Sequence, residues 1–220
     1  MTIQDIGRLA QKGEGLHVEF KKKAAHPEKI VKEIVAMANT DGGFLLIGVD
    51  DDGTVSGQKY IEEEVYAMDK AIKELIFPSL QLKKQVVSLN QKKGVAIYFI
   101  SKSENRPHFI YNDHQKKAFV RVADKSIQAS KEMWEIMKRQ KRKEDVLFRY
   151  GKKEELLIKA LASRSYITLK EYMEIAKLPI YIASRTLVKL VLANVIDVIP
   201  QESEDRFIPK YHLESPPGSG

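Results

Sequence analysis

The chain has 220 residues, of which 43% are hydrophobic, and it carries 37 Lys and Arg against 30 Asp and Glu, which gives a net charge of +7. This length suffices for one large or two small domains, and the positive excess favours acidic partners such as nucleic acid. The chain contains no cysteine, which excludes disulfides, a thiolate nucleophile and cysteine-bound zinc.

The hydrophobic runs of the sequence are short. None approaches the roughly 18 apolar residues that span a bilayer, and no signal-peptide pattern follows the start. We therefore expect a cytoplasmic protein without a membrane partner.

The first predicted element is a short strand within GEGLHVEF, residues 13–20. Apolar residues occupy every second position from Leu16 to Phe20, which is the period of a strand with one buried face. Glu19 lies on the polar face, and Glu14 lies at an odd offset from it. A bend at the flanking glycines could bring both carboxylates to the same side.

The rest of the first part alternates between helical and strand periods. Apolar residues at three- and four-residue spacing predict helices, and short apolar or alternating runs predict strands, some of them joined in hairpins. Helices are expected at 28–39, 61–77 and 130–143, and strands at 44–49, at 81–89 paired with 94–100, and at 108–111 paired with 118–122. The expected fold over residues 1–145 is α+β, a mixed sheet with flanking helices.

The C-terminal part has a different pattern. Three short helices are expected at 153–162, 168–177 and 181–193, followed by strands at 195–199 and 207–211. This order is typical of a winged helix-turn-helix domain, which we place at residues 146–213. The polar tail 214–220 is expected to be disordered.

Three blocks of the sequence resemble one known family. They are VEFK at 18–21, ANTDGGFLLIGVDDDGTVSG at 38–57 and FVRVADKSIQAS at 119–130. In this order and spacing they resemble the Schlafen AlbA-like family, formerly called divergent AAA, over about residues 5–140. The resemblance implies a nucleic-acid-binding domain of the kind that precedes winged-helix segments in bacterial transcriptional regulators. The first hypothesis is therefore a DNA-binding transcriptional regulator, with nucleic acid, DNA or RNA, as its partner.

The same resemblance implies a second hypothesis, a metal-dependent endoribonuclease. Animal Schlafens of this fold use two glutamates five residues apart and an aspartate after the glycine-containing strand, and the matching positions here are Glu14, Glu19 and Asp50. Three carboxylates could hold Mg²⁺ or Mn²⁺, and the metal would activate water and neutralise charge on a phosphate. The alternative is that each acid has only a structural role, so enzymatic activity and a metal cofactor both stay open.

The glycine-containing turns at 41–43 and 50–53 suggest a phosphate cradle at first sight. The GxxxxGK[ST] pattern of a P-loop is absent, however. These glycines are therefore expected to serve tight turns, and no ATP site is predicted.

Cationic residues near strand ends and turns are candidates for contacts with a phosphate backbone. In the first domain these candidates are Lys21, Lys22, Lys23, Arg121 and Lys125.

The exposed side of the third C-terminal helix is expected to read the major groove. Its candidate residues are Tyr181, Ser184, Arg185 and Lys189. The expected wing is acidic, which disfavours contact with phosphates; its acids are Glu202, Glu204 and Asp205. The third hypothesis is therefore an interaction scaffold in which this domain makes a homodimer.

Overall fold

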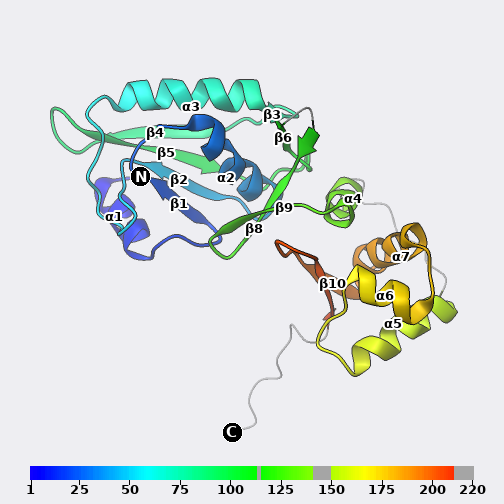
Figure 1. Cartoon of the computed structure of the whole chain (residues 1–220). Coiled ribbons are helices and arrows are strands. Elements are labelled where there is room, and N and C mark those ends of the chain that lie inside the picture. The colour runs from blue at the N-terminus through cyan, green and yellow to red at the C-terminus, as the bar shows by residue number, and fades with distance from the viewer. Residues whose placement is uncertain (113–114, 141–149, 211–220) are drawn as a thin grey trace, which may run out of the picture. The chain divides into compact units, whose positions relative to one another are not determined.

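The computed structural model describes residues 1–112, 115–140 and 150–210 (Figure 1). Contacts divide the chain into two compact units, Met1–Gln128 and Ala129–Gly220. The division falls earlier than the expected boundary after residue 145, because the helix that follows residue 130 packs within the second unit. The tail 214–220, expected to be disordered, lies outside the described residues.

The first unit combines helices and strands, as expected for an α+β domain. Its helices are α1 (Ile3–Gln11), α2 (Pro27–Asn39) and α3 (Ile61–Leu75). Its strands are β1 (Val18–Lys21), β2 (Gly43–Ile47), β3 (Ile76–Phe77), β4 (Lys83–Ser88), β5 (Gly94–Ile100), β6 (Phe109–Asn112), β7 (Gln115–Lys117), β8 (Phe119–Val122) and β9 (Lys125–Gln128).

The main sheet of this unit has the strand order β1-β2-β5-β4 (Figure 1). β1 and β2 are parallel and are connected through α2, whereas β5 runs antiparallel to both β2 and β4. The sheet is therefore mixed, as predicted, and β1 forms one of its edges.

Helices cover both faces of the main sheet. α2 and α3 pack on one face, where Leu45 and Ile47 of β2 join the same hydrophobic cluster. The intervening Leu46 belongs to a second cluster, which α1 completes with Ile6 and Ala10. β2 is therefore a central strand covered on both faces, which agrees with the continuous apolar run of the strand expected at 44–49.

Helix α1 is the helix that the sequence patterns did not predict. It begins with a capping box in which Thr2 and Asp5 bind each other's backbone N–H groups. Its buried residues are Ile6 and Ala10. An apolar stripe this short does not stand out as a helical period.

The expected hairpin of residues 108–111 with 118–122 is wrong. β6 instead pairs with the polar strand β7, and β8 pairs with β9. Residues 115–117 are Gln, Lys and Lys, so they lack the apolar alternation by which a strand is predicted.

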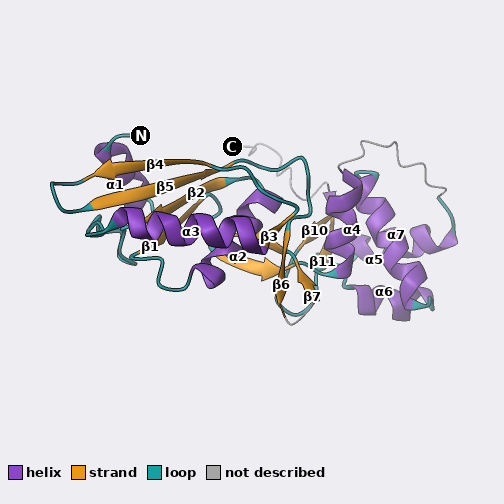
Figure 2. Cartoon of the chain, turned by 90° about the horizontal axis from the view of Figure 1, so that it is seen from above, coloured by secondary structure: helices purple, strands orange, loops and turns teal. Residues whose placement is uncertain are grey.

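The end of α3 also differs from the prediction. The helix ends at Leu75, and Ile76 and Phe77 form β3, which pairs with β6. Pro78 explains the early end, because the residue before a proline is disfavoured in the helical conformation and shifts to extended backbone. As a result β3, β6 and β7 form a separate small sheet beside the C-terminal end of α3 (Figure 2).

Gly42, between α2 and β2, cannot be replaced without strain. Its φ is +74°, and a Cβ at this position would lie 2.5 Å from the carbonyl oxygen of Ile100. We expect Gly42→Ala to lower the free energy of unfolding by about 2 kcal/mol, measured by urea unfolding. The matched control is Gly7→Ala, since Gly7 lies inside α1 with open space around its Cβ position. This control should gain about 0.5–1 kcal/mol, and equal effects of the two substitutions would contradict the prediction.

The second unit is mainly helical. Its elements are α4 (Lys131–Gln140), α5 (Lys152–Ala162), α6 (Leu169–Ala176), α7 (Ile180–Leu192), β10 (Ile196–Ile199) and β11 (Arg206–Pro209). The predicted order of three helices and two strands after α4 is confirmed. Among the described helices, none combines the length and the hydrophobicity that a membrane span requires.

The core of the second unit lies between α5, α6 and α7. Leu157, Tyr172 and Leu187, one from each helix, are fully buried there. A bridge between Ile167 and Phe207 joins the segment before α6 to β11, and α4 packs against α7.

Candidate functional site

The chain bends before β1 at Gly13, whose φ is +78°. Gly15 N donates a hydrogen bond of 2.9 Å to the carbonyl oxygen of Val18, and Glu14 thereby reaches the edge of β1. There, Phe20 N donates a hydrogen bond of 3.1 Å to Glu14 Oε1. Because β1 is an edge strand, this carboxylate binds a backbone group on the side where the sheet has no further strand.

The bend brings Glu14 and Glu19 to the same ammonium group. Lys21 Nζ donates a hydrogen bond to Glu19 Oε1 and lies 3.7 Å from Glu14 Oε1. Burial lowers the pKa of Lys21, but the hydrogen bond with Glu19 and the charges of the nearby glutamates outweigh burial, so this pKa is raised. The pKa of Glu14 is also raised, chiefly because burial disfavours its charged form. The expected proximity of these two carboxylates is confirmed, and a cation of the chain itself lies with them.

Glu19 is bound on its other side by Arg121, whose side chain is fully buried. Arg121 Nη2 donates to Glu19 Oε2 at 2.6 Å, and Nη1 donates to Glu33 Oε2 at 2.8 Å. Arg121 Nε donates to the carbonyl oxygen of Gly15 at 3.1 Å. One guanidinium therefore joins β8 to α2 and to the start of β1. This corrects the expectation that Arg121 contacts a phosphate backbone, because a side chain without exposed surface cannot reach one.

Glu33 is the member of this network that the sequence patterns missed. It lies on α2 directly before a run of buried apolar residues that begins at Ile34, and it is itself buried. Besides the bond from Arg121, it accepts a hydrogen bond from Ser126 Oγ of β9. The signal was present in the sequence: an acid inside an apolar helical stripe needs a buried cation or donors to offset its desolvation.

Asp50 takes part in a different contact, with its Oδ1 3.1 Å from Lys22 Nζ. Among the residues that the structure describes, no group of three or more His, Cys, Asp or Glu side chains is placed to hold a metal ion. The expected set of Glu14, Glu19 and Asp50 is therefore not assembled as a site for Mg²⁺ or Mn²⁺. The charges do not fit such a site either, because two cations of the chain already bind Glu19.

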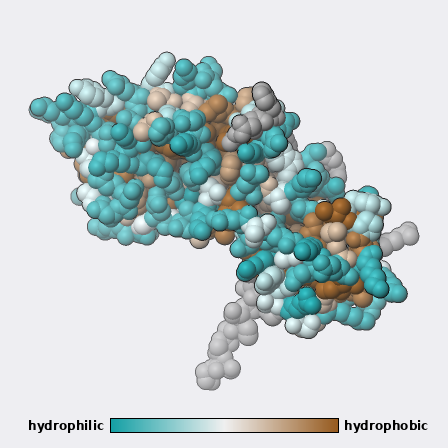
Figure 3. Space-filling model, viewed as in Figure 1, coloured by the Kyte–Doolittle hydropathy of each residue, from teal (hydrophilic) through white to brown (hydrophobic). Residues whose placement is uncertain are grey.

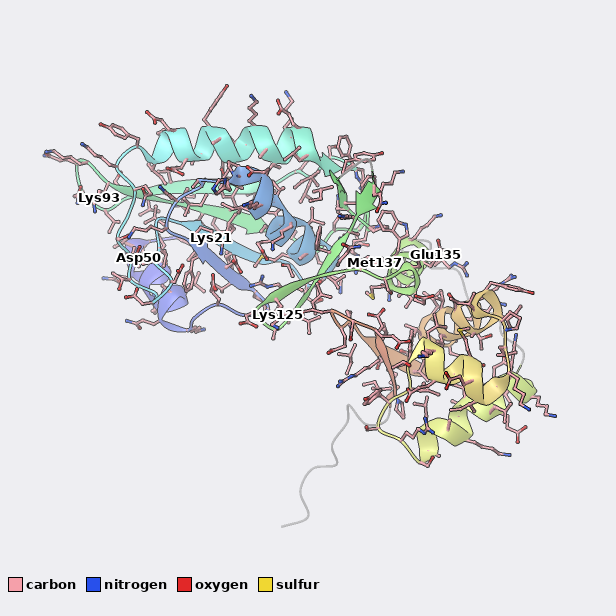
Figure 4. The ribbon with its side chains drawn as sticks, in the orientation of Figure 1. Lys21, Asp50, Lys93, Lys125, Glu135 and Met137 are labelled. Atoms are coloured by element: carbon pink, nitrogen blue, oxygen red, sulfur yellow. The ribbon has the colours of Figure 1, made fainter. Side chains whose placement is uncertain are left out.

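The remaining candidate cations of the first unit differ in exposure. Lys21 is half-buried among the glutamates, whereas Lys22 and Lys23, directly after β1, are exposed. Lys125, the first residue of β9, is also exposed. Figure 4 shows Lys125 apart from Lys21 and Asp50. The predicted phosphate contacts thus lie on separate parts of this unit.

A match to a family model shows to which family the chain belongs. The model of the family Schlafen, AlbA_2 matches residues 14–130, which is more than half of the chain. The chain belongs to the Schlafen AlbA_2 family. This membership confirms the resemblance seen in the sequence and points to a nucleic-acid-binding domain.

Two solved structures are similar to this AlbA_2 protein. One is the N-terminal domain of a protein from Nitrosomonas europaea described as related to the ATP-dependent DNA helicase RecG; it is 17% identical, with a TM-score of 0.45 over 59% of this chain and 94% of that one. The other is the DIP2311 protein from Corynebacterium diphtheriae, 18% identical with a TM-score of 0.48. The similarity covers 95% of this AlbA_2 chain but 38% of DIP2311. A comparison with curated proteins gives no match.

Outside the range that matches the AlbA_2 model, α7 carries the candidates for groove reading. Tyr181 is 68% exposed and Arg185 is exposed, whereas Ser184 and Lys189 are partly covered. Ile180, at the start of the helix, is also exposed, and Figure 3 shows hydrophobic residues at the surface over α7. The exposed candidates therefore lie in the N-terminal half of α7.

Proposed function

We propose that this AlbA_2 protein is a DNA-binding transcriptional regulator. In this proposal the first unit binds the phosphate backbone, and the second unit acts as a winged helix-turn-helix that reads duplex DNA. The observation that carries the proposal is membership in the AlbA_2 family, which points to nucleic-acid binding. The net charge of +7 agrees with an acidic partner.

In the first unit, Lys22 and Lys23 are the main candidates for backbone contacts. The Lys22 side chain is 67% exposed, and its Nζ lies 3.1 Å from Oδ1 of Asp50, whose side chain is 24% exposed. Because most of the Lys22 side chain is open to solvent, a phosphate oxygen can approach its ammonium group from that side. Contacts of this type give affinity without sequence choice.

In the second unit, the order of elements supports a helix-turn-helix. α6 begins with a capping box of Thr168 and Glu171 and ends at Lys177 in the left-handed conformation, after which α7 begins. In such motifs the second helix enters the major groove with its N-terminal residues toward the bases. Tyr181 and Arg185 occupy those positions on α7 and are exposed.

The acids of the expected wing disfavour contact with DNA phosphates less than the sequence suggests. Glu204 Oε1 accepts a hydrogen bond of 2.9 Å from Lys170 N at the start of α6. Asp205 is buried and accepts hydrogen bonds from Ser130 Oγ at 2.5 Å and from Gln201 N at 3.3 Å. Burial raises the pKa of Asp205. Two of the three acids therefore serve the fold of the second unit.

The test is the salt dependence of binding to labelled duplex DNA and to RNA, followed by fluorescence anisotropy. Each phosphate contact contributes about 0.9 to the slope of log affinity against log salt. The double variant Lys22→Ala, Lys23→Ala is therefore expected to bind more weakly and to lower that slope by about two. Lys92→Ala is the matched control, because Lys92 is an exposed lysine in the turn between β4 and β5. Absence of binding at low salt, or an affinity that does not change with salt, would overturn the proposal.

Neither alternative function has a comparable observation in its favour. The ribonuclease hypothesis needs free carboxylates, whereas Lys21 and Arg121 bind Glu19. A homodimer stays a prediction, which a molar-mass measurement in solution would check.

A further inference from the structure

The small sheet of β3, β6 and β7 has one buried face and one aromatic face. Ile76 pairs with Ile110, and both are buried in the main core. Because side chains alternate along a strand, the neighbouring pair of Phe77 and Phe109 points to the opposite face. Tyr111, two residues after Phe109, lies on that same face.

The three rings on this face contact one another. The rings of Phe77 and Phe109 are stacked, with centroids 6.1 Å apart and an interplanar angle of 27°. Tyr111 meets both rings edge-on, at 5.4 Å from Phe77 and 5.5 Å from Phe109. Such pairs hold the rings in a fixed arrangement.

This aromatic group remains open to solvent. Phe77 is 39% exposed and Tyr111 is 50% exposed. Figure 3 shows hydrophobic residues at the surface where α3 and β3 meet. Exposed aromatic side chains that gather in one place mark interaction sites more often than single ones do.

The charge around the rings identifies the class of ligand. Lys116 Nζ lies over the ring of Phe109, 5.1 Å from its centroid, and Lys116 pairs with Tyr111, so it shares the aromatic face. β3, β6 and β7 contain no acidic residue within their described bounds. Flat rings for bases beside ammonium groups for phosphates are what proteins use to bind single-stranded nucleic acid.

We infer that the face formed by Phe77, Phe109, Tyr111 and Lys116 is a stacking platform for the unpaired bases of single-stranded nucleic acid. This inference rests on the proposed nucleic-acid binding and names a second class of substrate beside duplex DNA. A base stacks on the exposed ring of Tyr111, and Lys116 binds the adjoining phosphate. Bases in a duplex are already stacked and paired, so the platform favours unpaired strands.

The experiment measures binding of the full chain to a short labelled oligothymidylate and to a labelled abasic strand of the same length. The abasic strand has the same phosphates but nothing to stack. We expect the oligothymidylate to bind more tightly. Tyr111→Leu should weaken that binding about tenfold and leave binding of the abasic strand unchanged. Tyr111→Trp should keep the affinity, because tryptophan also offers a flat ring.

Tyr66→Leu is the control, since Tyr66 is a 72% exposed tyrosine on α3. The platform is rejected if Tyr111→Leu binds the oligothymidylate as the wild type does, or if both strands bind equally. In those two outcomes the salt-dependent binding of the proposed function still stands. If the wild type binds neither strand nor duplex DNA, both the platform and the proposed function fail.

Discussion

Replacing Arg121 with methionine is expected to lower the free energy of unfolding of the first unit by about 3–5 kcal/mol. Methionine keeps much of the volume but removes the charge that Glu19 and Glu33 share. Both acids are buried, and each would lose its most enclosed cation, leaving Lys21 beside Glu19 and Lys32 beside Glu33 as the remaining ion-pair partners. The loss is measured by urea unfolding, read by hydrogen exchange in peptides from residues 1–128 so that the second unit does not contribute.

Two further variants make the Arg121 prediction specific. Lys125→Met removes an exposed cation from the same hairpin and should change the free energy of unfolding by less than about 0.5 kcal/mol. Adding Glu19→Gln and Glu33→Gln to Arg121→Met should restore part of the lost stability, because no buried charge is then left without a partner. Equal stability of Arg121→Met and the wild type would show that the guanidinium is not the centre of this network.

Asn39→Ala is expected to cost about 4 kcal/mol, because this side chain joins three elements. Asn39 is 1% exposed at the end of α2. Its Nδ2 donates to the carbonyl oxygens of His108 at 2.8 Å and Phe119 at 2.9 Å, and its Oδ1 accepts from His108 N at 2.8 Å. Alanine removes the three hydrogen bonds that these backbone groups make with Asn39, at about 1–3 kcal/mol for each.

The Asn39 prediction is measured by the same unfolding experiment. Asn105→Ala provides the control, since Asn105 is exposed in the same unit and its substitution should change stability by less than about 0.5 kcal/mol. Hydrogen exchange should also quicken at the amide of His108, which loses its acceptor. A variant that keeps both the stability and the slow exchange of the wild type would contradict the role given to Asn39.

The periodic elements of this protein could be predicted from its sequence because their signals are local. α2 begins at Pro27, one residue before the helix expected at 28–39, and the apolar run of β2 marks a strand covered on both faces. β7 could not be predicted in this way, because its side chains are polar and only its pairing with β6 makes it a strand. The same holds for β3, whose two residues continue the apolar pattern of α3.

The candidate site was predictable only where the chain folds back on itself over a short distance. The glycines on either side of Glu14 allowed the prediction of a bend that brings the carboxylates of Glu14 and Glu19 together. The partner of Glu19, however, lies 102 positions further along the chain, and nothing in a local pattern says which arginine reaches which acid. Arg121 therefore looked like a surface cation, although its guanidinium is the most enclosed charge of the network.

The large sequence separation between Glu19 and Arg121 has a consequence for folding during synthesis. A ribosome releases the two acids of the network many residues before it releases the arginine that neutralises them. Until then Glu19 of β1 and Glu33 of α2 lack the arginine that binds both of them in the folded unit, and burying either acid in charged form without it is costly. We therefore expect the first unit to complete its fold only after the β8–β9 hairpin has emerged from the ribosome.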